Sequence, residues 1–216
     1  MNRRDFSINL VAGGVGLALA GGAVAQGAPV EGQQYVRLST PAPYGPLPAD
    51  KKVEVVEFFW YECPHCYAFD PMLEAWTKRL PADVSFRRVP VGFTARHVLT
   101  QKMYYALEDM GKLDANLHRR IFNAIHQQNK RLLSEADMAA FLGENGVDPA
   151  KFTEMYRSFQ VSNQSNRAKQ LTEAYKIDGV PALGIQGRYW TSGALAGSHE
   201  RSLLVADYLI ERARKG

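Results

Sequence analysis

Cysteine is scarce in this chain: its 216 residues include only two, Cys63 and Cys66. A tetrahedral zinc site commonly draws its four ligands from two cysteine pairs or from one pair with spaced histidines, and no second pair is present. Covalent haem attachment needs a histidine directly after the second cysteine, but that position holds Tyr67. The sequence therefore argues against zinc, excludes this type of haem site and implies no metal or organic cofactor.

A large excess of charge of one sign is also lacking. The chain has 26 Lys and Arg against 22 Asp and Glu, a formal net charge of +4. No basic run interleaved with aromatic residues accompanies this mild basicity, so we expect no nucleic acid partner. Repeats and low-complexity tracts are absent from the sequence, and its length suits one domain with an insertion.

Long apolar stretches are missing except at the start of the chain. Arg3 and Arg4 precede an uncharged stretch rich in Gly and Ala over residues 7–25. This order is typical of a signal peptide, and the small residues at its end predict cleavage between Ala25 and Gln26. Both the twin-arginine and the general secretory routes fit, and an uncleaved membrane anchor is the alternative that the glycines and short length disfavour. We expect an exported protein.

The two cysteines that are present stand in one tetrapeptide, Cys63-Pro64-His65-Cys66. Before it, residues 51–60 are rich in β-branched and aromatic side chains, which predicts a buried strand followed by a turn. From Pro64 onward the pattern predicts a helix with proline at its first position, because apolar residues recur three or four apart: Ala68, Met72, Ala75, Trp76 and Leu80. Cys63 is thus expected at the helix N-cap.

The N-cap position predicts redox chemistry. Unpaired backbone N–H groups and the helix dipole favour a thiolate at Cys63, which we expect to be the nucleophile. Cys66 lies one turn further along as the resolving thiol, and His65 can stabilise the thiolate by charge or by a hydrogen bond. The alternative is an inert structural disulfide, as exported proteins often carry.

The remaining sequence predicts a strand and helix framework interrupted by helices. Residues 26–50 form a proline-containing extension with one edge strand near 35–38. A strand near 84–90 completes a parallel βαβ unit with the strand at 51–60, and residues 95–175 read as an inserted all-helical domain. Residues 176–216 then supply a hairpin and a final amphipathic helix, whose expected buried residues are Leu203, Leu204, Tyr208 and Leu209.

These features together resemble the thioredoxin superfamily, and within it the DsbA family. The residues that carry the resemblance are Glu57-Phe58-Phe59, Cys63-Pro64-His65-Cys66-Tyr67, the helical insertion and Gly179-Val180-Pro181, in that order. The resemblance covers nearly all of the chain after the signal peptide. It implies an α/β thioredoxin fold over 51–94 and 176–216, with the helical domain of residues 95–175 inserted.

The resemblance also implies roles for residues that spacing alone does not assign. Pro181 is expected to follow a cis peptide bond and to face the cysteines, with Val180 binding extended substrate through its backbone. Glu57 is expected to be buried beneath the cysteine pair, where it can relay a proton to Cys66. Without the resemblance, Val180-Pro181 would be read as an ordinary trans bond and Glu57 as a solvent-facing strand residue.

Some positions near the tetrapeptide are left open. Glu62 would raise the pKa of Cys63 if its charge lay close, but a solvent-facing and screened side chain is the preferred expectation. Five residues could line a peptide groove, although at helical spacing they are more often core: Phe93, Met103, Tyr104, Tyr105 and Met110.

The function implied by the resemblance is disulfide donation to newly exported proteins. It would be performed in the periplasm by a monomer that a DsbB-type membrane protein reoxidises. Two alternatives stay open, a disulfide reductase or isomerase and a peptide-binding module with a structural disulfide. The redox potential separates the reductase from the oxidase, and a Cys63→Ser variant tests the binding module.

Overall fold

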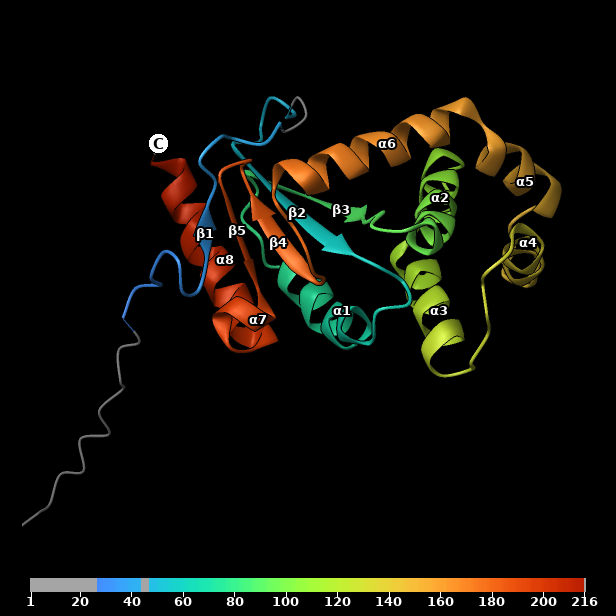
Figure 1. The fold of residues 1–216 in the computed structure, drawn as a ribbon, viewed down its shortest axis with the longest axis horizontal. Coiled ribbons are helices and arrows are strands. Elements are labelled where there is room, and N and C mark those ends of the chain that lie inside the picture. The colour runs from blue at the N-terminus through green and yellow to red at the C-terminus, as the bar shows by residue number, and fades with distance from the viewer. Residues whose placement is uncertain (1–26, 44–46, 216) are drawn as a thin grey trace, which may run out of the picture.

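The computed structural model describes residues 27–43 and 47–215, so the predicted signal peptide at 1–25 lies outside the described residues. A five-stranded sheet forms the centre, and helices lie on both of its faces (Figure 1). In the described ranges no helix is long and apolar enough to cross a membrane. The elements in chain order are β1 Val36–Arg37, β2 Val53–Phe59, α1 Pro64–Thr77, β3 Val84–Pro90, α2 Ala95–Asp109, α3 Ala115–His126, α4 Glu135–Glu144, α5 Pro149–Arg157, α6 Phe159–Ala174, β4 Ala182–Ile185, β5 Tyr189–Ser192, α7 Gly193–Ala196 and α8 His199–Arg214.

Strand β2 lies inside the sheet, whose order is β1-β5-β4-β2-β3. It pairs in parallel with β3, from Val53 opposite Val84 onward, and antiparallel with β4. All seven of its residues are buried, as the apolar run in the sequence predicts. Three residues separate the end of strand β2 from the cysteine tetrapeptide, and this places the tetrapeptide near the C-terminal end of an inner strand.

The two faces of β2 contribute to different hydrophobic cores. Val53 and Val55 pack with residues of α1 and α8, whereas Val56 and Phe58 pack with the helical insertion. Because side chains alternate along a strand, Glu57 belongs to the same face as Val53 and Val55. Its carboxyl is thereby directed toward the side that α1 covers.

Helix α1 forms where the sequence predicts it, and of the recurring apolar residues Trp76 is buried while Met72 and Leu80 are partly buried against the core. Ala68 and Ala75 are exposed, because the helix turns another stripe toward the sheet. That stripe consists of Cys66, Phe69, Asp70, Leu73 and Trp76. The stripe contains a charged residue, Asp70, which an apolar pattern does not count.

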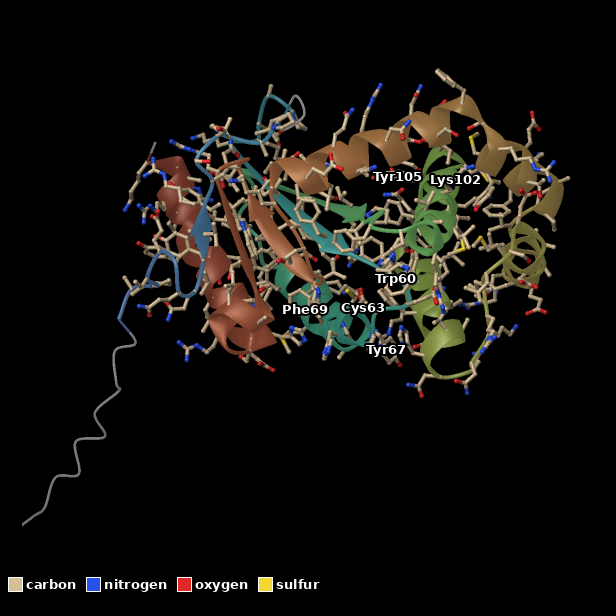
Figure 2. The ribbon with its side chains drawn as sticks, viewed as in Figure 1. Trp60, Cys63, Tyr67, Phe69, Lys102 and Tyr105 are labelled. Atoms are coloured by element: carbon tan, nitrogen blue, oxygen red, sulfur yellow. The ribbon has the colours of Figure 1, made fainter. Side chains whose placement is uncertain are left out.

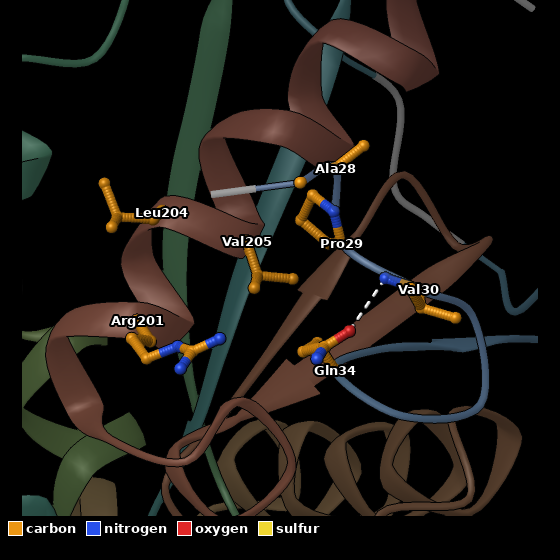
Figure 3. Close-up of a pocket in the computed structure, with 8 residues that line it drawn as sticks. Ala28, Pro29, Val30, Gln34, Arg201, Leu204 and Val205 are labelled. Atoms are coloured by element: carbon orange, nitrogen blue, oxygen red, sulfur yellow. Dashed lines mark hydrogen bonds between the residues drawn. The ribbon is translucent and has the colours of Figure 1, made fainter. Parts of the chain in front are cut away.

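In helix α8, one of the four residues expected to be buried is exposed. Leu203 and Leu209 are buried as expected, but Leu204 is 59% exposed. Leu204 lies beside a pocket of about 490 Å³ between α8 and the segment that precedes β1 (Figure 3). Val205, one position further along the helix, is buried in its place.

Candidate active site

Cys63 is the N-cap residue of α1, with extended backbone angles (φ −79°, ψ 117°) and Pro64 directly after it. Its relative exposure is 8%, whereas Cys66 is fully buried. Both sulfurs are free thiols. Cys63 lies at the start of α1, between the sheet and the helical insertion (Figure 2).

The surroundings of the two sulfurs shift their pKa values in opposite directions. The hydrogen bond with Cys66 is the main cause that lowers the pKa of Cys63 to about 6, against the effect of burial. The backbone N–H groups of Cys66 and His65 lower it further, as expected at a helix N-terminus. Burial raises the pKa of Cys66 well above its usual range, and the neighbouring Cys63 adds to this rise. One sulfur is therefore a thiolate near neutral pH while the other stays protonated.

His65 has a smaller role in this shift than its position suggests. Its side chain is exposed at the start of α1. Its charge lowers the pKa of Cys63, but this effect is smaller than that of the Cys66 hydrogen bond and those of the backbone N–H groups. The helix terminus and the second thiol supply more of the thiolate stabilisation than the imidazole.

The loop before β4 lies directly beside Cys63. The Val180-Pro181 peptide bond is cis. The Cys63 thiol donates to the carbonyl oxygen of Val180 across 3.5 Å. Two residues that are 117 positions apart in the chain thus meet at the Cys63 sulfur.

Glu57 is buried, with 2% of its surface exposed, and accepts a hydrogen bond of 2.9 Å from Arg88 Nε. Burial raises its pKa to about 7; the charge of Asp70 adds to the rise and Arg88 opposes it. Its charge also contributes to the raised pKa of Cys66. A buried carboxyl with this pKa can give or take a proton at neutral pH.

A group of buried charges around Asp70 is absent from the sequence prediction. Arg88 bridges Glu57 and Asp70, since its second terminal nitrogen lies 3.3 Å from Asp70 Oδ1. Arg119 of α3 donates to the other carboxylate oxygen at 3.2 Å, and His118 Nε2 lies 3.4 Å from Oδ1. Burial opposes ionisation, but the His118 contact and both guanidinium charges outweigh it and lower the pKa of Asp70. The pairing of Arg88 with Glu57 could have been predicted from the sequence, because the two residues lie opposite each other in the β2–β3 register.

Glu62 does not point into solvent, so the preferred expectation for this residue is wrong. Its carboxylate pairs with Arg96 of α2, with Arg96 Nε at 2.9 Å, and its side chain is only 12% exposed. It is not among the main groups that shift the pKa of Cys63. The guanidinium of Arg96 neutralises the charge that the sequence placed beside the nucleophile.

The five candidate groove residues divide between core and surface. Met103, Tyr104 and Tyr105 are buried and Met110 is partly buried, while Phe93 is 41% exposed. The pocket next to the cysteines is lined by other residues. It has a volume of about 660 Å³, and its walls include His65, Val180, Pro181, Trp190, Leu195 and His199.

Comparisons with known proteins agree with this geometry. The DSBA-like thioredoxin domain family matches residues 84–205. The thiol:disulfide interchange protein DsbA of Azotobacter vinelandii is 45% identical over 183 residues, which cover 85% of this chain and 84% of the relative. An alignment of that length necessarily includes the cysteine pair.

Solved structures show the same architecture. The crystal structure of Pseudomonas aeruginosa DsbA is 43% identical and superposes with a TM-score of 0.80 over 85% of this chain and 94% of that one. The oxidoreductase DsbA from Xylella fastidiosa is 32% identical and has a TM-score of 0.80 over 87% and 99% of the two chains. The chain therefore belongs to the DsbA family, and it is a thiol:disulfide oxidoreductase of oxidative protein folding whose redox pair is Cys63 and Cys66.

Proposed function

We propose that the protein donates its Cys63–Cys66 disulfide to reduced proteins that have been exported to the periplasm, with Cys63 as the reactive sulfur. The observation that carries this direction of transfer is the contrast between the two thiols. The pKa of Cys63 is lowered to about 6, whereas that of Cys66 is raised. Stabilising the Cys63 thiolate favours the reduced enzyme, and this makes the disulfide a stronger oxidant.

The reaction begins when a substrate thiolate attacks Cys63 Sγ in the oxidised enzyme. The new substrate–Cys63 bond forms as the Cys63–Cys66 bond breaks, and Cys66 leaves with the electron pair. Because Cys66 is buried, it needs a proton, and Glu57 is the proposed donor. A second substrate thiolate then attacks the substrate sulfur of the mixed disulfide, and Cys63 leaves as its stabilised thiolate. The substrate has lost two electrons, and the enzyme holds them as a dithiol.

The remaining assignments follow from the DsbA relationship. Val180 and Pro181 are proposed to face the substrate segment, because the Val180 carbonyl already lies 3.5 Å from Cys63 Sγ. A DsbB-type membrane protein is the proposed acceptor of the two electrons. The protein is proposed to act as a monomer after removal of residues 1–25.

Equilibration with reduced and oxidised glutathione tests this function. An oxidase keeps its pair largely reduced even at a high ratio of oxidised to reduced glutathione, whereas a pair that stays oxidised in a strongly reducing buffer indicates a reductase or a structural disulfide. Mass spectrometry after acid quenching and alkylation measures the two forms. A Cys63→Ser variant that still promotes substrate refolding as well as the parent would support a peptide-binding module instead.

A further inference from the structure

The connection between β2 and Cys63 consists of three residues, and the helical insertion holds each of them. Trp60 stacks on His97 of α2, with ring centroids 4.0 Å apart. Glu62 pairs with Arg96 of the same helix. Tyr61, between them, is held by α3. The segment that delivers the nucleophile is therefore fixed by a part of the chain outside the thioredoxin-like unit.

Helix α3 holds Tyr61 by both of its polar ends. The Tyr61 hydroxyl lies 2.7 Å from His118 Nδ1, and the Tyr61 carbonyl oxygen lies 2.8 Å from His126 Nε2. The ring itself packs edge-on against Phe122, with centroids 5.0 Å apart. Positions 118, 122 and 126 are four residues apart, so all three side chains project from one face of the helix.

The hydrogen-bond roles of both imidazoles follow from their partners. A carbonyl only accepts, so His126 Nε2 carries a hydrogen toward Tyr61. His118 Nε2 faces the ionised Asp70 at 3.4 Å, a contact that falls short of good hydrogen-bond geometry. Its hydrogen is best placed on that side, which leaves Nδ1 to accept from the Tyr61 hydroxyl. Burial and the nearby Arg88 lower the pKa of His118, which agrees with a neutral ring.

The same helix also contacts the residue that follows the redox pair. Tyr67 donates its hydroxyl hydrogen to Asn123 Oδ1 at 3.2 Å and stacks on His126 at 4.8 Å. Arg119 donates to the Tyr67 carbonyl at 3.2 Å. Two tyrosines that bracket the tetrapeptide are thus held by one face of one helix.

We propose that α3 is the positioning element of the active site, in which His118 and His126 hold Tyr61 so that Cys63 stays at the N-terminus of α1. This inference rests on the proposed function, because it explains what sets the strength of the oxidant. The groups that stabilise the Cys63 thiolate act over short range, and the field of a helix terminus fades within one turn. A looser turn at Tyr61 moves the sulfur away from them.

The two redox forms depend on this support to different degrees. In the oxidised enzyme the bond to Cys66 holds the Cys63 sulfur covalently. In the reduced enzyme no covalent bond holds this sulfur, and its place near the backbone N–H groups of His65 and Cys66 depends on the chain geometry and on hydrogen bonds with Cys66 and the Val180 carbonyl. Weakening the hold on Tyr61 therefore destabilises the reduced form more than the oxidised form.

Tyr61→Phe is the test variant, because it removes the hydroxyl that donates a hydrogen bond to His118 Nδ1 and keeps the ring against Phe122. We expect the pKa of Cys63, followed by thiolate absorbance, to rise by about half to one unit, and the glutathione equilibrium constant to shift about threefold to tenfold toward the oxidised enzyme. Urea unfolding should show a larger loss of stability for the reduced form. Tyr156→Phe is the matched control: it deletes a hydroxyl that donates to the Leu99 carbonyl at 3.3 Å inside the insertion. It should leave the Cys63 pKa unchanged.

His118→Leu and the double variant complete the test. If both act through the same bond, the double variant shifts the Cys63 pKa no further than His118→Leu alone. An unchanged pKa and glutathione equilibrium in Tyr61→Phe, or equal losses of stability in both redox forms, would overturn the proposal even if His118→Leu does not fold. A wild-type pair that stays oxidised in a strongly reducing glutathione buffer refutes the proposed function instead, and the shifts in the Cys63 pKa of the variants still decide the role of α3.

Discussion

Glu57 and Arg88 form a buried ion pair across two parallel strands, with Arg88 Nε 2.9 Å from Glu57 Oε2. The same guanidinium reaches Asp70 on α1, so two carboxylates share one cation. Glu57 is the carboxylate of the two whose pKa is raised, to about 7. This division leaves Asp70 as the fixed charge and Glu57 as the group that can exchange a proton.

Replacing Glu57 with Gln should slow disulfide donation without abolishing it. Loss of a general acid and base typically costs at least about 100-fold, and water access can recover part of this, so we expect a fall of about 10-fold to 100-fold in the rate of exchange with a reduced peptide. The pH dependence near pH 7 should disappear from the rate profile, because the titrating carboxyl is gone. Stopped-flow fluorescence with a dithiol peptide measures both.

Glu54→Gln is the control for this change. Glu54 is also buried on β2 and pairs with Arg87 at 2.8 Å, but it belongs to the opposite face of the strand. The Glu54→Gln variant should be less stable than the parent protein, but its exchange rate and the pH profile of that rate should be unchanged. Equal slowing in both variants would assign the effect to the strand rather than to Glu57.

The two thiols of the reduced protein should differ in reactivity at mildly acidic pH. At pH 6 about half of Cys63 is thiolate, while an ordinary thiol of pKa ~8.5 is only roughly 0.3% ionised. Iodoacetamide should therefore label Cys63 at least about tenfold faster than a free cysteine peptide, and Cys66 only after unfolding. Peptide mapping by mass spectrometry distinguishes the sites, and equal labelling of both would contradict the assigned nucleophile.

His65→Ser should weaken the oxidant by a modest amount. His65 is exposed, and its charge is a lesser cause of the low Cys63 pKa, so we expect the glutathione equilibrium constant to change about twofold to fivefold toward the oxidised enzyme. Because the effect is one of charge, it should shrink when the salt concentration is raised. A shift that is independent of salt would indicate a conformational cause.

The reduced protein should be more stable than the oxidised protein at neutral pH. Folding lowers the pKa of Cys63 from ~8.5 to about 6, so the unfolded state binds more protons between these values and the stability of the reduced form rises with pH across this window. The contribution is fully present above ~8.5 and is lost as the pH falls through about 6. The disulfide closes a very short loop and offers little entropic compensation. Urea unfolding of both forms at pH 5 and pH 7.5 measures the difference, and an oxidised form that is more stable at both would indicate a structural disulfide.

The sequence predicts the parts of the site that depend on short chain segments. Cys63 at the N-cap follows from a strand, a turn and Pro64, which are neighbours along the chain. The hold on Tyr61 by His118 and His126 depends on how α3 docks against α1, across 57 and 65 residues of sequence. The position of Glu62 was missed for the same reason, since its partner Arg96 belongs to a helix whose packing no local pattern determines. Asp70 was missed because a charged residue on a buried face breaks the apolar rule and is satisfied only by distant partners.

The order in which the chain is synthesised bears on the contact between Cys63 and Val180. A chain that emerges N-terminus first presents Cys63 117 residues before Val180, with Cys66 three residues behind Cys63, and β2 lacks its neighbour β4 until all five inserted helices have emerged. Contacts across such long loops form late, because closing the loop costs entropy before any pairing compensates for it. A nascent molecule thus presents its own thiols uncovered for as long as the insertion takes to emerge.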